Sequence, residues 1–328
     1  MALETALANS STITRAIKDR YYNELFLRQA DKKFVHKQLG QLNIKVPGGA
    51  GGYGAEVLNW TKWVNLAAVT SGSGEGVPTN AVTFSAVRVT GTTAQYDNAV
   101  SISDIAAYAS FGDVMKAAVE RLAYNAGLSI DNIVRDAIKN AGTQQSASAQ
   151  AHYTAVPAGA NLIISEIRKA TRTLMANDAP EQSDGSWVAV VHPHALYDLQ
   201  GDSTSGGWIE ANKYTDGRDG LLTGEVGKLY GVRFLSTSNG ATLGSTGTVA
   251  TSANTASGTI YVTSIFGKDA FGVSELQALK TYVKPFGSGG TGDPTDKIST
   301  AGWKTLFGTT VLNSAFFVNI NHTVSSTA

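Results

Sequence analysis

The chain has 328 residues, with 26 basic and 26 acidic side chains, no cysteine and 35 glycines. Its zero net charge excludes the positive field of a dedicated nucleic-acid binder, and the absence of cysteine excludes disulfides and thiolate metal sites. A hydrophobic content of 42% supports a large buried core, whereas only 16% of the residues are charged, against about 25% in ordinary soluble proteins. We expect neither a secretory signal nor an apolar run of the roughly 20 residues that span a membrane.

Residues 1–45 are the most charged part of the chain, with eight basic and four acidic side chains. Large apolar side chains recur there at spacings of three and four residues, which predicts an amphipathic helix: Tyr21, Tyr22, Leu25 and Phe26. Two interpretations stay open for this arm. It packs on its own domain, or it docks on a neighbour or faces a polyanion.

Residues 46–100 are predicted to form a long two-stranded excursion. The glycine-rich stretch 47–54 indicates a hinge, and a polar loop of Gly and Ser at 71–80 turns the chain. Alternation of apolar and polar side chains predicts the outgoing strand at 58–66 and returning strands at 82–89 and 96–102. Such a hairpin has little core of its own and is marginally stable until it lies on another surface.

From Ser101 onward the apolar period becomes helical. Ser110-Phe-Gly-Asp113 is a capping-box-like start for the main helix. The apolar stripe then follows an unbroken i+4 series: Val114, Ala118, Leu122, Ala126, Ile130, Val134 and Ile138. The pattern predicts a helix of about 28 residues and roughly 42 Å, on which other elements are mounted.

Helical and strand patterns alternate through the rest of the chain, which predicts the fold class α+β. A helix is expected around 163–174 and a helical turn or short helix at 194–199. Strands are expected at 187–191, 230–234, 259–266, 270–276 and in a last segment that ends at Phe316, Val318 and Ile320. The charge-free stretch 236–258 is expected to be a surface loop, and strand pairing at Asn239-Gly240 stays open.

One glycine-rich segment matches a motif of cofactor binding. Gly49-Ala-Gly-Gly-Tyr-Gly54 matches the dinucleotide pattern G-x-G-x-x-G, and Glu75 follows 21 residues after the last glycine. That motif needs a helix directly after it to hold the pyrophosphate, whereas strand alternation follows here. We therefore expect no dinucleotide cofactor.

His192-Pro-His194, with Asp198 and Asp202 close behind, offers two imidazoles to a metal, but no third ligand follows at a recognised spacing. A strand-to-helix turn in which proline starts the helix explains these residues better. The other histidines are scattered and belong to no nucleophile motif: His36, His152 and His322.

Trp60 and Trp63 are candidates for stacking on bases or sugars, yet core packing or a subunit contact is the favoured interpretation. A carboxylate pair for glycoside hydrolysis is indicated by no motif. We therefore expect no catalytic, cofactor-binding or metal-binding residue, no cofactor and no enzymatic activity.

Four segments carry a resemblance to a known family. They are residues 21–30 (YYNELFLRQA) with 34–40 (FVHKQLG), 93–104 (TAQYDNAVSISD), 266–273 (FGKDAFGV), and 284–294 (KPFGSGGTGDP) with 299–304 (STAGWK). With these motifs in this order, the chain resembles the major capsid (coat) proteins of tailed double-stranded DNA bacteriophages, which have the Hong Kong 97-type fold.

The resemblance implies a division of the chain into an N-terminal arm (1–45), an extended loop (46–100), a spine helix of the peripheral domain (101–154), an axial domain (155–283) and a return to the peripheral domain (284–328). The resemblance also implies a structural protein of the virion. It would form hexamers and pentamers of an icosahedral capsid around phage DNA, after assembly in the host cytoplasm.

The implied partners are further copies of the chain, portal, scaffolding and decoration proteins, and DNA contacted non-specifically, with no membrane. Two alternatives stay open, an encapsulin-like protein nanocompartment shell and a soluble glycosidase-type enzyme. The low charge fits a chain whose surface is largely covered by neighbours, because interface cores are depleted of charged residues.

Overall fold

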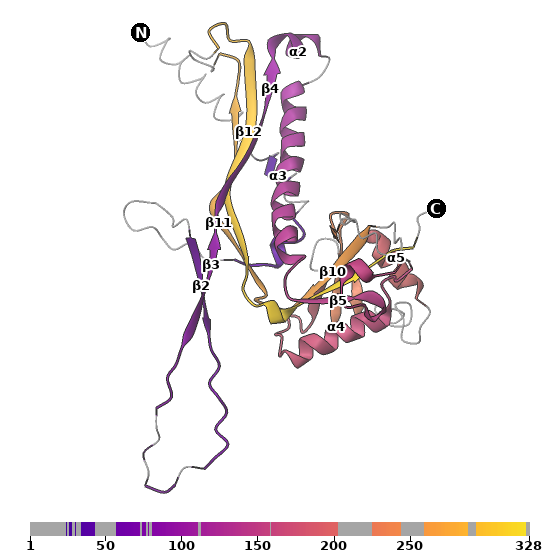
Figure 1. Ribbon diagram of the computed structural model, residues 1–328. Helices are drawn as coiled ribbons and strands as arrows, with labels where there is room; N and C mark the ends of the chain where they lie inside the picture. Colours follow the sequence, from indigo (N-terminus) through magenta and orange to yellow (C-terminus); the bar gives the residue numbers. More distant parts are fainter. Residues whose placement is uncertain are drawn as a thin grey trace.

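The computed structural model describes residues 24, 26–27, 30, 34–42, 57–72, 74–76, 78, 81–110, 113–157, 159–202, 225–243, 259–287 and 293–325. The protein is elongated (Figure 1). A long sheet runs beside a long helix, a compact α/β unit lies to one side of their lower end, and a hairpin projects beyond both. The predicted α+β fold class is confirmed.

The long sheet has four strands in the order β1-β11-β12-β4: β1 (Gln41–Leu42), β11 (Phe271–Lys284), β12 (Ile298–Val311) and β4 (Ala94–Ser103). Alternate side chains of β12 are buried beneath the long helix, among them Ala301, Trp303 and Phe307. The predicted strand at 270–276 continues to Lys284, where it still pairs with Thr300 of β12. Part of the predicted axial segment 155–283 therefore belongs to the long sheet.

The long helix α3 (Val114–Ile138) has 25 residues, and the short helix α2 (Asp104–Ala109) precedes it. The predicted stripe is buried from Leu122 to Ile138. The N-cap differs from the prediction. Asp113 caps α3 by accepting a hydrogen bond from the Lys116 amide at 3.0 Å, whereas Ser110 ends α2. An aspartate immediately before the first helical turn can accept directly from the backbone amides of that turn, which have no partner within the helix.

The α/β unit is built on a seven-stranded sheet in the order β5-β13-β10-β6-β8-β7, with β9 also paired to β10. Its strands are β5 (Thr143–Ser146), β6 (Trp187–Val191), β7 (Glu225–Leu229), β8 (Val232–Ser236), β9 (Ala241–Leu243), β10 (Ile260–Phe266) and β13 (Phe317–His322). Its helices are α4 (Ile164–Ala176) and α5 (Pro193–Gly201), as predicted. Three short 3-10 turns are described in or beside this unit: η2 (Ala147–Ala149), η3 (Tyr153–Ala155) and η5 (Ser314–Phe316). A further turn, η1 (Lys37–Leu39), lies in the N-terminal segment.

The end of the chain crosses between the two sheets. After β12, strand β13 pairs antiparallel with β10 and parallel with β5, so it lies inside the α/β unit. The predicted segment 284–328 is therefore shared. Its first part forms β12 of the long sheet, and its last strand, β13, lies buried between β5 and β10 in the other sheet.

The projecting hairpin consists of β2 (Val57–Trp63) and β3 (Ala86–Thr92), paired antiparallel with Trp63 opposite Ala86. The predicted strands were longer, from 58 to 66 and from 82. The described residues between Trp63 and Ala86 form neither helix nor strand, because no layer covers the chain there to favour pairing. The pairing ends three residues beyond Trp60, which is buried.

Only part of the predicted arm lies within the described residues. Phe26 and Ala30 are fully buried and pack with Val119, Leu122 and Trp303, so this part of the arm packs on its own subunit. The glycine-rich stretch 47–54 and the low-complexity residues 244–258 lie outside the described residues. Within 236–243, the predicted loop contains strand β9, which pairs with β10 directly after Asn239-Gly240.

Candidate functional site

The hairpin is fixed to the subunit body by Trp60, in the middle of β2. Its side chain is buried, and a Cβ added to Gly272 in β11 would lie only 2.6 Å from the indole ring. A Cβ at Gly91 of β3 would lie 3.0 Å from the same ring. Glycine in a strand interior typically marks such a close approach. Trp60 is therefore a core residue, as one of its two favoured interpretations predicted.

Beyond this anchor the hairpin carries an exposed apolar surface, which we call the loop surface: Trp63, Val64, Leu66, Val69, Val82 and Phe84. Trp63 and Phe84 are each 59% exposed and stack on each other, with ring centroids 4.6 Å apart and planes 10° from parallel. Trp63 is three residues from Trp60 and so points to the opposite side of the strand. Because Trp63 is exposed, it is not a core residue, and a subunit contact is the other interpretation that the sequence favoured.

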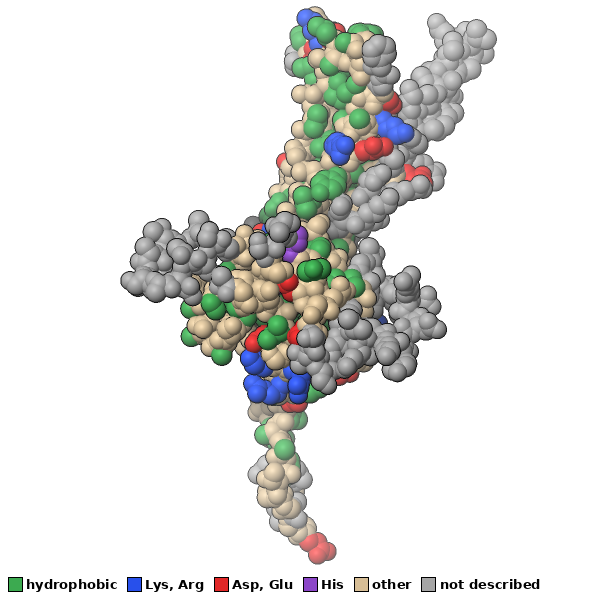
Figure 2. All heavy atoms as spheres, turned by 90° about the vertical axis from the view of Figure 1, so that its right-hand side faces the viewer, with side chains coloured by type: hydrophobic (Ala, Val, Ile, Leu, Met, Phe, Trp, Pro, Cys, Tyr) green, Lys and Arg blue, Asp and Glu red, His purple; other side chains and the backbone are tan. Residues whose placement is uncertain are grey.

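The loop surface is nearly free of charge. Among residues 64–85 the sequence contains one ionisable side chain, Glu75, and Figure 2 shows an acidic group at the far end of the projection. Exposed apolar groups gathered on one projecting segment mark a surface that binds another molecule. A two-stranded hairpin in isolation is marginally stable, so binding would also order this segment.

The opposite end of the subunit carries a second exposed apolar group. Helix α2 has no buried residue, and its two large apolar side chains, Ile105 and Tyr108, are 75% and 89% exposed. They are three positions apart and therefore share one face of the helix. Figure 1 places α2 at the far end from the hairpin. The subunit thus offers different contact surfaces at its two ends.

The His-Pro-His segment forms the predicted strand-to-helix turn. His192 is the N-cap of α5, its Nδ1 accepts from the His194 amide at 3.2 Å, and Pro193 starts the helix. The two imidazole rings lie 4.8 Å apart. Burial, together with the neighbouring His194, lowers the pKa of His192. These contacts give the segment a structural role without a bound metal.

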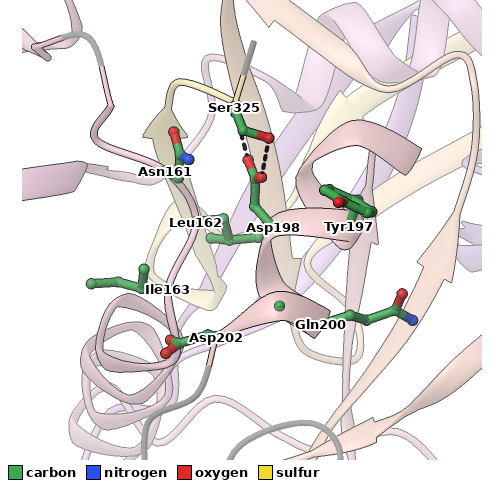
Figure 3. Close-up of a pocket in the computed structure, with 9 residues that line it drawn as sticks. Asn161, Leu162, Ile163, Tyr197, Asp198, Gln200, Asp202 and Ser325 are labelled. Carbon is green, nitrogen blue, oxygen red and sulfur yellow. Dashed lines mark hydrogen bonds between the residues drawn. The ribbon is translucent and has the colours of Figure 1, made fainter. Parts of the chain in front are cut away.

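A hollow of about 630 Å³ lies beside α5, and Figure 3 shows the side chains that line it. Its two carboxylates already have structural partners. Asp198 accepts hydrogen bonds from the amide and the hydroxyl of Ser325, and Asp202 accepts from the Ile164 amide at 3.0 Å. Asp198 thus holds the segment that follows β13, and Asp202 holds the start of α4, so both carboxylates have structural roles.

His322 is buried inside the α/β unit. Its Nδ1 lies 2.9 Å from the Thr323 carbonyl oxygen, and its Nε2 lies 2.9 Å from Thr263 Oγ1. A carbonyl oxygen only accepts, so Nδ1–H donates to it and Nε2 accepts from the threonine hydroxyl. Burial lowers the pKa of His322 to about 4. The side chain is therefore a neutral member of the core.

The remaining histidines also have local partners. His152 caps η3 through the Thr154 amide, and His36 lies 2.8 Å from Asp131. Within the described ranges, no three His, Asp or Glu side chains gather in a group that could hold a metal ion. None of the described helices is both long and apolar enough to cross a membrane. The strongest functional feature of the described chain is thus the loop surface.

Sequence comparison alone identifies no relative, since no model of a known protein family and no curated protein matches. Solved structures do match. The capsid of Ralstonia phage GP4 gives a TM-score of 0.70 over 88% of both chains at 12% identity. The chain has a phage capsid fold.

Two further phage capsid structures match at similar coverage. The cyanophage Pam1 capsid gives a TM-score of 0.63 over 88% of this chain and 89% of that one, at 15% identity. The capsid of cyanophage P-SCSP1u gives 0.61 over 89% of each chain, at 16% identity. The fold that the four sequence motifs implied is therefore confirmed. In this chain the hairpin that carries the loop surface projects from the body of the fold.

Proposed function

We propose that this chain is the major capsid protein of a tailed double-stranded DNA phage, a structural and non-enzymatic subunit of an icosahedral shell. The observation that carries the proposal is the phage capsid fold, which extends over 88% of this chain and of the GP4 capsid chain. The exposed loop surface supports it, because a projection without its own core is suited to lie on a neighbouring subunit.

The shape of the subunit favours ring formation. A contact between the loop surface of one copy and a different surface of the next copy is heterologous, and such contacts close into rings when the rotation permits. Hexamers and pentamers of an icosahedral shell are rings of this kind. Zero net charge reduces repulsion among the many copies in the shell.

The domain division proposed for this shell follows the sheets. The end of the predicted loop, 46–100, forms β4 of the long sheet, so we assign 46–93 to the extended loop. We assign α3 with the long sheet, including β4 and β11, to the peripheral domain. We assign the α/β unit to the axial domain, including β13 from the end of the chain. We assign residues 1–45 to the N-terminal arm. Its eight basic and four acidic side chains give it a local excess of four positive charges.

The wider partners belong to the same proposal. The basic arm is the candidate for non-specific contact with the phosphates of packaged DNA. Portal, scaffolding and decoration proteins would complete a virion that assembles in the host cytoplasm.

Negative-stain electron microscopy of the purified recombinant protein tests the proposal. Shells, tubular polyheads or isolated capsomers are the expected result, and a variant with Trp63→Ser and Phe84→Ser should form fewer of them. A compact monomer at every concentration, with or without partner proteins, would contradict the proposal. DNA inside native particles distinguishes a virion from an encapsulin-like compartment, which would hold protein cargo instead.

A further inference from the structure

A buried carboxylate joins three parts of the chain that are far apart in sequence. Asp131 lies in α3 and is fully buried. Its Oδ1 accepts from the backbone amides of Val35 at 3.0 Å and His36 at 2.8 Å. Its Oδ2 accepts from His36 Nδ1 at 2.8 Å and from Asn239 Nδ2 at 3.0 Å. The N-terminal segment, the long helix and the α/β unit therefore meet at one side chain.

Asn239 contacts the long helix at two points one turn apart. Its Nδ2 donates to Asp131, while its Oδ1 accepts from Arg135 Nη1 at 2.6 Å. Both helix residues lie on one face, because positions four apart are neighbours along a helix. The side-chain amide of Asn239 thus binds one acceptor, Asp131, and one donor, Arg135, at fixed positions on α3. These two hydrogen bonds together define both the position and the angle of the contact.

The turn that carries Asn239 is rigidly seated on the α/β unit. The Asn239 amide donates to Thr237 Oγ1 at 3.2 Å, and the Gly240 amide donates to the Thr237 carbonyl at 3.2 Å. A Cβ at Gly240 would lie 2.9 Å from the Cβ of His192, so the glycine permits close packing on the start of α5. Movement of the α/β unit would therefore move Asn239 with it.

One further polar contact holds the end of α3, where Asn319 Nδ2 of β13 donates to the carbonyl oxygens of Ile138, Lys139 and Ala141 at 2.9, 3.0 and 2.7 Å. The packing around these contacts is apolar. Side chains of the α/β unit pack on α3 and on the long sheet in one shared cluster, which includes Val188, Leu235 and Phe266 against Ile130 and Val134. Hydrophobic contact is non-directional and permits sliding, whereas a hydrogen bond weakens steeply when its angle changes. The apolar cluster therefore holds the two parts together but defines their angle less sharply than the hydrogen bonds of Asn239 do, and Asn319 fixes only the end of α3.

We propose that Asp131, Arg135 and Asn239, which we call the orientation cluster, set the angle between the α/β unit and the long helix. Burial opposes ionisation of Asp131, but hydrogen bonds from His36 and Asn239 outweigh it and lower its pKa. The carboxylate is therefore charged at neutral pH and accepts all four hydrogen bonds. His36 and Asn239 share one carboxylate oxygen, so the N-terminal segment and the α/β unit are coupled through it.

The orientation cluster has a consequence that rests on the proposed function. If the subunit forms shells, the angle that the cluster sets contributes to the curvature between neighbouring subunits. Loss of the cluster would then give particles of mixed size or shape from subunits that still fold. The angle itself exists in a single subunit and is measured without a shell.

Distance measurement by electron paramagnetic resonance tests the proposal. The chain has no cysteine, so two spin labels attach only where cysteine is introduced. Lys116→Cys on α3 and Arg172→Cys on α4 place the labels at exposed positions on the two parts. With the native cluster we expect one narrow distance distribution. With Asn239→Ala we expect a shifted or broadened distribution, while circular dichroism and thermal unfolding stay close to those of the labelled parent.

Two further variants make the result decisive. Arg135 is partly exposed and is the second hydrogen-bond partner of Asn239 on α3. Arg135→Ala should therefore shift or broaden the distance distribution as Asn239→Ala does. Thr263→Val is the matched control, because it removes one buried hydrogen bond inside the α/β unit and should leave the distribution narrow. Narrow distributions with Asn239→Ala and Arg135→Ala, identical to that of the parent, would overturn the proposal whether or not the protein forms shells.

Discussion

The loop surface gives the most direct mutational prediction. Trp63 is 59% exposed in the single subunit. An aromatic side chain buries about 150–250 Å², so covering the exposed part on a neighbour removes roughly 120 Å² of apolar surface from water. At about 25 cal/mol per Å², this burial stabilises each contact by about 3 kcal/mol. Trp63→Ser should therefore weaken subunit association roughly 100-fold per contact, since 1.4 kcal/mol is a factor of ten.

The assay is the subunit concentration at which particles first appear, followed by light scattering and size-exclusion chromatography. Trp63→Ser should raise this concentration strongly, and Trp63→Phe should raise it little because it keeps an apolar ring that can stack on Phe84. Thermal unfolding of the unassembled subunit should be nearly unchanged for both variants, because Trp63 lies outside the core. An unchanged assembly concentration for Trp63→Ser would show that Trp63 is not buried between subunits.

Three further predictions concern the stability of the subunit. First, the pKa of His322 is lowered from 6.5 to about 4, so the unfolded chain binds the proton more tightly; stability should be complete above pH 6.5 and fall by about 3 kcal/mol as the pH drops to 4. In urea titrations across this range, the unfolding free energy of His322→Gln should not show this loss of about 3 kcal/mol. An equal pH dependence in the variant would contradict the role given to His322. Second, Gly272→Ala places a methyl group against Trp60 and should destabilise by about 1–3 kcal/mol, with faster amide exchange in β2, whereas Gly201→Ala has open space around it and should be tolerated. Third, Asp113→Ala removes the cap of α3 and should cost about 1 kcal/mol in denaturant unfolding; Asp113→Ser should retain most of it, and equal stability of all three proteins would argue against the cap.

Much of the fold could be predicted from local periodicity. The i+4 series through Leu122, Ile130 and Ile138 predicted the long helix, and the apolar run at 187–191 predicted a buried strand. The predicted end of β11 at 276 was too early. Its register shifts between Glu275 and Gln277, and again before Lys280, which breaks the alternation that marks a strand.

The candidate site was predictable only in part. Alternation along β2 separated the face of Trp60 from that of Trp63, but whether either face was covered depended on β11, far along the chain. The same limit applies to Asp131 and Asn239, which are 108 positions apart. An aspartate beside the apolar stripe of a helix is a signal for a buried polar contact, yet its partners leave no local period in the sequence.

Cryo-electron microscopy of assembled particles would show where the loop surface lies relative to neighbouring copies of the chain. We expect a closed shell in which residues 64–85 of each copy lie on a neighbouring copy, with Trp63 and Phe84 buried between them. Particles in which these side chains remain exposed to solvent, or a preparation that contains only separate subunits under every assembly condition, would contradict it.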